Sequence, residues 1–537
     1  MTRLTCIDLF CGCGGLTLGM QRAGFEVLAA VDHDEAAVKV LSKNCPDIPH
    51  VLQADLAKFS PRDLAAKIGR DHVEVIVGGP PCQGFSMARQ RDGANSGPRM
   101  VKDKRRQLYQ EFLRFVHHFR PKVFVMENVP GIKSAAGGRY LTRVQHRARL
   151  IGYRVHAQTE RVSSLGVPQK RVRQLIIGTR LDLPILFPGK VSRAPRATER
   201  PTLGEAIGDL PVLRAGSGDD DSEYDRERRT AHVAKHGTGY LFGVLEADRA
   251  ARLTAHVARP HSDRDLRDFA RLKEGEHSGV AAQRGVEFEF PYDKEAFWDR
   301  YTRQHRNRLC STIVAHMAKD GLMFIHPTQN RSLTPREAAR VQSFPDWFVF
   351  PVSRTHQFRL IGNAVPPLVG EALGLAVKSY LERTVQQQDR TLLADYVPRT
   401  EAEAAAGLVA ILEVADRKSL HRLSLDGFRR GWASIAFLYP EIHPDSAREH
   451  GSQISKARRP KLPDVSSDRR RERVQEYVQS GWPVAFEPVA REALRRYRRG
   501  HLSEDEFYCS QALLAATRDR RATQAAEVSC EQEKASA

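Results

Sequence analysis

The stretch Val73-Glu-Val-Ile-Val-Gly-Gly-Pro-Pro-Cys-Gln-Gly-Phe-Ser86 joins an apolar run to a turn built from paired glycines and paired prolines. The apolar run predicts a buried strand over residues 73–77. Glycines let backbone or ligand approach closely, and prolines fix φ and remove donors, so the turn should hold Cys82 in one pose. Cys82 is therefore either a displayed nucleophile or a small buried thiol.

Short β-rich runs alternate with helical patterns on both sides of this turn. Apolar residues at helical spacing predict helices over Asp34–Asn44 and Gln107–Phe119. The predicted strands are Leu4–Asp8, Val27–Val31, Val73–Val77, Val123–Met126 and Gln174–Gly178. Strands joined by crossover helices predict a doubly wound α/β domain over residues 1–184, with a mostly parallel sheet.

The pattern changes after residue 184. Residues 185–325 are rich in Pro, Gly and charge without sustained alternation, so a smaller, irregular domain is expected there. Periodic structure returns at 333–344, with Thr334 as the predicted N-cap, and residues 326–384 should complete the first domain. Residues 385–537 read as an Arg-rich, mainly helical extension that either contacts phosphates or packs on a partner.

Composition limits the class of partner. Among 537 residues, 84 Lys and Arg face 65 Asp and Glu, a net charge of +19, which predicts a polyanionic partner, nucleic acid first. No apolar run approaches the about 20 residues of a spanning helix and no signal peptide is recognisable, so a cytoplasmic protein without membrane contact is expected. The eight cysteines lack metal-site spacing, so no metal is expected and the thiols should stay reduced.

The segment Asp8-Leu-Phe-Cys-Gly-Cys-Gly-Gly15 follows the first predicted strand, where a glycine-rich turn brings N–H groups close to a ligand. Its spacing differs from the dinucleotide pattern, which disfavours a nicotinamide cofactor. Asp32 closes the second strand and can hold ribose hydroxyls, while Asp55 can face an adenine amine. Either acid alone could be a solvated loop end, but together they predict a nucleoside pocket at the carboxyl ends of the strands.

Glu127 ends the strand Val123–Met126 and so lies at the same sheet edge as Cys82. It is either a structural acid that accepts backbone N–H bonds or a poorly hydrated one that shares a proton with a ring nitrogen. Arg171 and Arg173 would point the same way from one strand, although a basic strand alone is usually a solvated face.

These blocks, taken in order, closely resemble the DNA (cytosine-5)-methyltransferases of the bacterial type. The matching blocks are Asp8–Gly15, Gly78–Ser86, Glu127–Gly131, Gln169–Arg173, Arg331–Arg340 and Gly362–Pro367. The resemblance covers residues 1–383 and leaves the extension outside the common core of the family.

The resemblance implies a Rossmann-like, S-adenosylmethionine-dependent methyltransferase fold with a target-recognition domain at 185–325. S-adenosylmethionine would be the cofactor, S-adenosylhomocysteine its product, and no metal would be needed. The implied cofactor-binding residues are Asp8, Phe10, Gly12, Gly14, Gly15, Asp32, His33, Asp55, Pro80, Asn363 and Val365. This chain departs from the common pattern at Cys11 and Cys13, at Asp32 where glutamate is commoner, and at His33 where a larger aromatic is frequent.

The resemblance also implies a mechanism. The Cys82 thiolate would add to carbon 6 of cytosine, Glu127 would act at N3, and Arg173, supported by Arg171, would fix the base through O2. The target base must leave the duplex stack for this chemistry. Gln83, Ser86 and Arg105, in a basic loop over residues 83–106, are expected DNA contacts, and Ser311–His316 is an expected base-reading segment.

Double-stranded DNA is the implied partner, together with a restriction endonuclease or proteins of a phage-defence system. Two alternatives stand beside this interpretation: a related methyltransferase acting on tRNA cytosine, and a non-enzymatic DNA-binding regulator that keeps the fold. The retained Cys82 and Glu127 disfavour the regulator, and the large segment between Arg173 and Arg331 disfavours the tRNA enzyme.

Overall fold

The structure, a computed structural model, describes residues 4–81, 108–135, 139–181, 192–199, 201–290 and 298–386. Four predicted site residues, Cys82, Gln83, Ser86 and Arg105, lie outside the described residues, as does the predicted extension beyond residue 386. The described chain falls into two compact units, and the candidate site and the recognition region both belong to the first.

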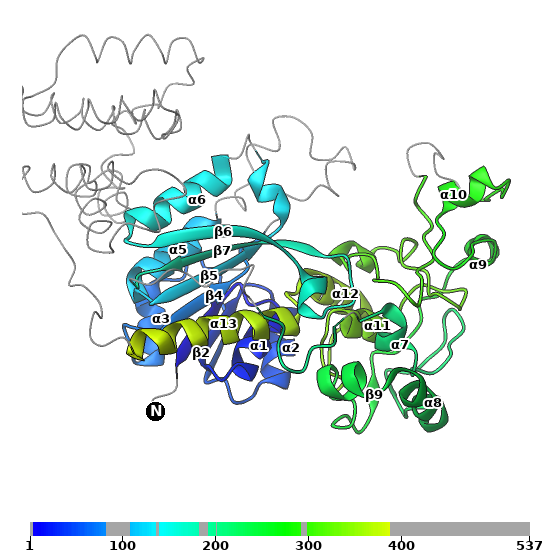
Figure 1. The fold of residues 1–537 in the computed structure, drawn as a ribbon, viewed down its shortest axis with the longest axis horizontal. Coiled ribbons are helices and arrows are strands. Elements are labelled where there is room, and N and C mark those ends of the chain that lie inside the picture. The colour runs from blue at the N-terminus through cyan, green and yellow to red at the C-terminus, as the bar shows by residue number, and fades with distance from the viewer. Residues whose placement is uncertain are drawn as a thin grey trace, which may run out of the picture. The chain divides into compact units, whose positions relative to one another are not determined.

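A seven-stranded sheet organises the fold (Figure 1). The strands are β1 (Thr5–Leu9), β2 (Glu26–Asp32), β3 (His50–Gln53), β4 (Val75–Gly78), β5 (Val123–Asn128), β6 (Arg154–Arg161) and β7 (Val172–Thr179). Their order is β3-β2-β1-β4-β5-β7-β6, and the pairs from β3 through to β5 are parallel. The predicted mostly parallel α/β sheet is confirmed, and β3 and β6 are strands that were not predicted.

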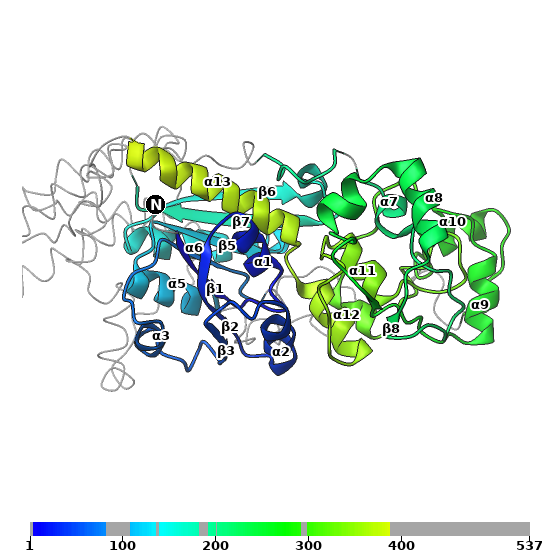
Figure 2. The same cartoon turned by 90° about the horizontal axis from the view of Figure 1, so that it is seen from below.

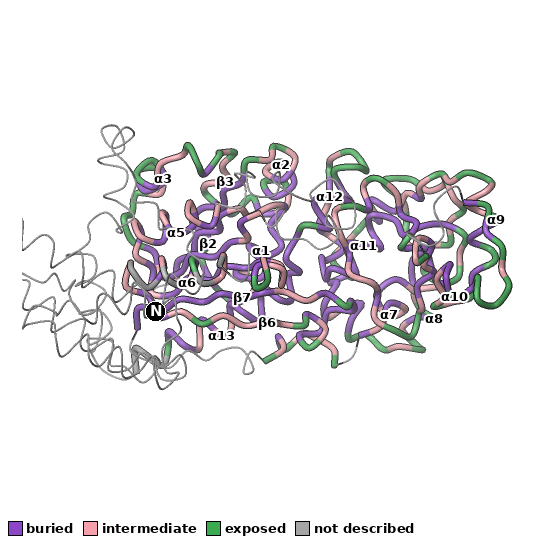
Figure 3. Tube along the Cα trace, turned by 90° about the horizontal axis from the view of Figure 1, so that it is seen from above, coloured by how far each residue is buried: buried purple, intermediate pink, exposed green. Residues whose placement is uncertain are grey.

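The strand order reverses between β1 and β4, which are neighbours in the sheet although β2 and β3 lie between them in sequence. In open α/β sheets ligands bind at such a reversal, outside the carboxyl ends of the strands. Both strands are buried along their whole length, as Figure 3 shows for most of the sheet. The loops that leave them, 10–15 and 79–81, therefore start from fixed points.

Helices cover both faces of the sheet (Figures 1 and 2). On one face α1 (Gly15–Arg22) packs on α13 (Pro367–Gln386), where Gly19 meets the backbone of Gly370 and Glu371. On the other face α3 (Pro61–Ile68) contacts α5 (Leu108–Phe119). The predicted helix from Asp34 is α2 (Glu35–Asn44), and the Asp34 carboxylate caps it by accepting from Ala36 N. The remaining helix of this half is α6 (Arg139–Leu150).

The chain returns to the sheet through α11 (Pro335–Val341) and α12 (Arg354–Asn363) before α13. Thr334 caps α11 as predicted, in a reciprocal pair with Glu337. The helix ends at Val341, earlier than predicted, because Ser343 adopts a left-handed φ of 61°. The segment Arg354–Glu382 is long and apolar enough to cross a membrane, but 83% of its most apolar window is buried inside the protein, as in a core helix.

The region between the two halves of the sheet domain is irregular, as predicted. Its elements are α7 (Leu203–Ile207), β8 (Asp221–Ser222), α8 (Arg226–His236), β9 (Leu253–Thr254), α9 (Asp263–Ala270) and α10 (Ser278–Gln283). Its outer part has a core of its own around Phe269, Tyr301 and Ile325. The boundaries at residues 184 and 325 stay predictions.

Two buried arginines of the 331–340 block, Arg336 and Arg340, fasten this region to the returning chain, and a third, Arg331, pairs within the returning chain. Arg340 pairs with Asp209 and Asp346, and Arg336 Nε donates to Thr254 O at 2.9 Å. Arg331 pairs with Glu337 at 2.7 Å. A buried charge is tolerated only when it is paired and hydrogen-bonded, so the contacts of Arg336 and Arg340 hold Thr254 and Asp209 against the returning chain.

Gly19→Ala tests the packing of α1 on α13. Alanine raises helix propensity by at most about 1 kcal/mol, but its Cβ would lie 2.4 Å from Glu371 N, and overpacking costs about 1–3 kcal/mol. We expect a lower free energy of unfolding in denaturant titrations. Gly243→Ala is the control, because the nearest atom to its Cβ, Arg196 O, is 3.5 Å away; equal effects of the two variants would contradict the packing argument.

A buried histidine, His326, and a half-buried one, His261, predict loss of stability in acid. Burial lowers the pKa of His326 to about 3 and that of His261 to about 4, from the ordinary 6.5. The unfolded chain therefore binds protons that the folded chain does not, so stability should fall as the pH drops from about 6.5 towards 4. The Tm measured between pH 7.5 and 4.5 tests this expectation. His326→Asn keeps an acceptor for Thr328 N, and in this variant the Tm should depend less on pH. An unchanged slope in that variant would refute the assignment.

Candidate functional site

The loop after β1 is shaped by left-handed residues. Phe10, Gly12 and Gly14 have φ values of 59°, 56° and 91°. A Cβ at Gly14 would lie 2.3 Å from Leu41 Cδ1, whereas no described atom lies within 4 Å of the Cβ position of Gly12. The loop is therefore packed at Gly14 and open at Gly12, where a ligand can approach the backbone.

Asp32 organises this loop from the end of β2. Its Oδ2 accepts Gly12 N at 2.8 Å, and its Oδ1 accepts Asp34 N at 2.9 Å and lies 3.2 Å from His33 Nδ1. Burial alone would raise the pKa of Asp32, but these hydrogen bonds, that of His33 foremost, outweigh burial and lower it. Asp32 is therefore a carboxylate at neutral pH.

His33 and Asp55 lie beside Asp32 and are both exposed. The hydrogen bond to Asp32 raises the pKa of His33 most, and the charge of Asp55 contributes to the same shift. Asp55 Oδ1 accepts Ala57 N at 3.0 Å, which fixes the turn after β3. The three residues predicted for a nucleoside are thus brought together; their ligand stays a prediction.

Asp8 lies beneath the loop, completely buried. Thr17 Oγ1 donates to its Oδ2 at 2.6 Å, and its Oδ1 has no hydrogen-bond partner among the described residues. Burial raises the pKa of Asp8 to about 7, with the charge of Asp32 adding to the shift and the Thr17 bond opposing it. Asp8 Oδ1 is therefore a buried acceptor that a hydrogen-bond donor of a ligand could satisfy.

The far end of the chain closes on the same loop. A Cβ at Gly15 would lie 2.0 Å from Val365 O, so only glycine permits this approach. Cys13 Sγ donates to Leu360 O at 3.7 Å, and Asn363, the last residue of α12, is exposed. The predicted closure of a cofactor pocket by residues 363 and 365 stays a prediction.

The turn that leads to Cys82 is held from two sides. A Cβ at Gly78 would lie 2.1 Å from Leu9 O, so the ends of β4 and β1 meet closely. Asn128 Nδ2, at the end of β5, donates to Pro80 O at 3.2 Å. Pro80 is two residues before Cys82. Its hydrogen bond to Asn128 therefore fixes the backbone close to the point where the described part of this turn ends.

Glu127 and Arg173 meet beside that turn. Arg173 Nε lies 2.6 Å from Glu127 Oε1, in an ion pair without the alignment of a hydrogen bond. Both side chains are almost buried, and the Cβ position of Gly79 is 3.4 Å from Glu127 Oε2. The structure thus brings the predicted acid and arginine together at the carboxyl ends of β4 and β5.

Arg171 has a different position from Arg173, contrary to the expectation that the two point the same way. It precedes β7 and is 1% exposed. Its guanidinium donates to the carbonyls of Ile313, Gly362 and Ala364 at 2.8, 3.1 and 2.9 Å. These bonds join three segments that are distant in sequence, and they supply the two terminal nitrogens of the buried guanidinium with acceptors.

Two glutamines that carried no predicted role complete this junction. Gln169 Oε1 accepts Ile313 N at 3.2 Å, and Gln169 Nε2 donates to Gln342 Oε1 at 2.6 Å. Gln342 Nε2 donates in turn to Ile361 O at 2.6 Å. Asn128 was likewise missed. Gln169 and Asn128 lie inside the matching blocks, and this is the one sequence signal that points to them. Their hydrogen-bond partners are remote in sequence.

The five described cysteines, Cys6, Cys11, Cys13, Cys45 and Cys310, are free and buried. Burial raises the pKa of Cys13 and of Cys45 to about 12, which keeps both as poorly nucleophilic thiols. Within the described ranges, no group of three His, Cys, Asp or Glu side chains could hold a metal ion.

Comparison with known proteins agrees with this geometry. A model of the C-5 cytosine-specific DNA methylase family matches residues 4–379. The Type II methyltransferase M.DdeI of Desulfomicrobium norvegicum is 35% identical over 70% of this chain and 89% of its own length. M.AgeI, a Type II methyltransferase of Thalassovita gelatinovora, is 33% identical over 69% of this chain and 98% of its own length.

A solved structure is also similar. It is described as a DNA modification methyltransferase encoded within a prophage, from E. coli, and aligns over 71% of this chain and 99% of its own with 28% identity and a TM-score of 0.55. The chain therefore belongs to the C-5 cytosine-specific DNA methylase family and is a DNA (cytosine-5)-methyltransferase of the bacterial type.

Proposed function

We propose that this enzyme transfers a methyl group from S-adenosylmethionine to carbon 5 of a flipped-out cytosine in double-stranded DNA, through a covalent bond between Cys82 and carbon 6. One observation carries the proposal. Glu127 and Arg173 form a nearly buried pair beside Gly79, at the edge where the turn towards Cys82 begins. Addition to a pyrimidine needs an acid, a cation and a thiolate, and the sequence supplies Cys82 three residues after Gly79.

Carbon 5 of cytosine is too weak a nucleophile to react unaided. In the proposed addition the Cys82 thiolate forms a bond to carbon 6, and the electron pair of the ring double bond moves towards carbon 5. Glu127 holds a proton at N3, and Arg173 offsets charge at O2. S-adenosylmethionine, when bound, supplies the methyl group. A base, for instance a water, then removes the carbon 5 proton, and the sulfur–carbon 6 bond breaks to return the thiolate.

Residues at the ends of β1, β2 and β3 fit the cofactor. The open side of Gly12 leaves room beside the backbone, and the Asp32 carboxylate can accept ribose hydroxyls. Asp8 has an unsatisfied oxygen beneath the loop. The remaining proposed contacts are Phe10, Gly14, Gly15, His33, Asp55, Pro80, Asn363 and Val365. Arg171 is proposed to position the site, because its guanidinium bonds join the segments around it.

DNA would reach this site through the loop that carries Gln83, Ser86 and Arg105, with sequence read by residues 185–325. Extruding the base costs a few kcal/mol, about the amount that such contacts can offset. The Type II names of the relatives support a role in restriction-modification, with a restriction endonuclease as partner and action on cytoplasmic DNA. Phage defence is a second proposed setting.

Replacement of Cys82 tests the covalent step. Cys82→Ala should lower the rate of methyl transfer to duplex DNA by roughly a thousandfold or more, while S-adenosylhomocysteine still binds. Cys45→Ala, which removes a buried thiol away from the site, is the control. Retained turnover in Cys82→Ala would refute the nucleophile, and methylation of total tRNA but not of duplex DNA would refute the substrate.

Glu127→Gln separates chemistry from binding. Loss of the acid should slow single-turnover methylation by roughly 100-fold, the scale of general acid catalysis, with a smaller change in the Kd for duplex DNA. Equal rates for Glu127→Gln and the unchanged enzyme would remove Glu127 from the mechanism.

Asp32→Asn tests the cofactor site. Asparagine has one acceptor oxygen where Asp32 uses two, so the Kd for S-adenosylhomocysteine should rise about 10-fold or more, as expected for lost hydrogen bonds to a charged group. Calorimetric titration measures this, and the exposed Asp71→Asn serves as the control. The same Kd in both variants would place the ribose elsewhere.

A further inference from the structure

Four large apolar side chains are substantially exposed among the described residues: Val212, Val280, Trp298 and Met323, at 63%, 42%, 45% and 39%. Single exposed apolar residues are ordinary, but a cluster requires an explanation. Trp298 covers Gly279, where a Cβ would lie 2.1 Å from its ring, next to Val280. Trp298 and Met323 are thus candidates for a shared surface.

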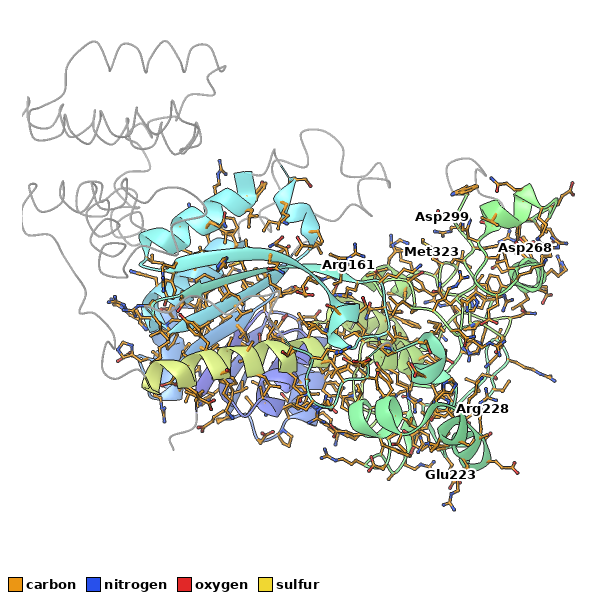
Figure 4. The ribbon with its side chains drawn as sticks, in the orientation of Figure 1. Arg161, Glu223, Arg228, Asp268, Asp299 and Met323 are labelled. Carbon is orange, nitrogen blue, oxygen red and sulfur yellow. The ribbon has the colours of Figure 1, made fainter. Side chains whose placement is uncertain are left out.

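The turns that carry Trp298 and Met323 lie side by side. Arg300 pairs with Asp320 at 2.8 Å, and Thr302 N donates to Leu322 O at 3.1 Å. Figure 4 shows the labelled Asp299 and Met323 close together, with Glu223 and Arg228 on a different side of this part of the molecule. We call Trp298 and Met323 the apolar pair.

Hydrogen bonds connect the turn that carries Met323 to the block Gln169–Arg173. Gln304 Nε2 donates to Met323 O at 2.9 Å, and Gln304 Oε1 accepts Ser311 N at 2.9 Å. The adjacent Cys310 O accepts Lys170 N at 2.9 Å. Lys170 lies next to Arg171, so the position of Met323 relative to the site is set by a short series of bonds.

The exposed cations of this region fall into two groups, those without an acidic partner and those paired with acids. The exposed cations Lys170, Arg308 and Lys319 have no acidic partner among the described residues. The outer arginines are neutralised by acids: Arg267 by Glu289, Arg284 by Glu276 and Arg306 by Glu274. Cations without an acidic partner can bind DNA phosphates, whereas the exposed side chains of the apolar pair can contact uncharged base edges.

We propose that Met323 and Trp298 contact the methyl group of thymine in the major groove, so that the recognised sequence contains a T·A pair at a fixed position from the target cytosine. The proposal rests on duplex DNA as the substrate. Thymine is the base that presents a methyl group in this groove, and an apolar side chain is the matching contact. A base-reading role also explains why two large apolar side chains stay exposed.

The test begins with the unchanged enzyme. Sequencing of methylated DNA from cells that express it gives the recognised sequence, and duplexes with that sequence then carry uracil in place of each thymine in turn. Uracil pairs as thymine does but lacks the methyl group. At the contacted position kcat/KM should fall about fourfold, the factor for one buried methyl group.

Variants assign the effect to the apolar pair. In Met323→Ala or Trp298→Ala the loss caused by uracil should vanish at one position, and other bases should be accepted there. Val212→Ala, outside the two turns, should keep the full effect. Met323→Ala leaves the backbone bond to Gln304 intact, so it serves if Trp298→Ala lowers the Tm.

The outcomes separate the two proposals. No methylation of duplex DNA by the unchanged enzyme would refute the proposed function. Methylation at a sequence without a T·A pair, or uracil effects that persist in both variants, would overturn the role of the apolar pair alone. The last outcome would fit a protein partner at this surface instead.

Discussion

The buried guanidinium of Arg171 joins three segments of the chain that are distant in sequence. It lies next to β7, which carries Arg173, and it bonds to Ile313, in the segment proposed to read DNA, and to Gly362 and Ala364, in the segment proposed to close the cofactor pocket. A charge buried to this degree is stable only with such acceptors. The junction therefore fixes how these three segments stand relative to one another, and with them the proposed sites of DNA reading, cofactor closure and base chemistry.

Close backbone approaches set the rest of the site. Gly78 lets β4 end against Leu9, and Gly15 lets the carbonyl of Val365 reach the cofactor loop. Both contacts lie where the strand order reverses, the position at which open α/β sheets bind ligands. With Asp32 held as a carboxylate by its own hydrogen bonds, the proposed cofactor site is prepared before a ligand arrives.

The sheet could be predicted from sequence because its central strands are continuous apolar runs. β3 and β6 were missed because they are largely exposed or half-buried and carry polar residues. The position of Glu127 at the sheet edge followed from its place at the end of a predicted strand, whereas its ion pair with Arg173 was not predicted. The burial of Arg171 and Arg340 did not, because arginine ordinarily indicates a surface and their partners, Ile313 and Asp209 among them, are remote in sequence.

The central claim is that Cys82 bonds to carbon 6 of the target cytosine. Duplex DNA with 5-fluorocytosine at the target position tests it most directly, because fluorine cannot leave as the carbon 5 proton does, and elimination is blocked. With S-adenosylmethionine present, mass spectrometry of the digested complex should locate the methylated base on the peptide that contains Cys82. Methylation of normal DNA without any trapped complex, or a complex through another cysteine, would contradict the account.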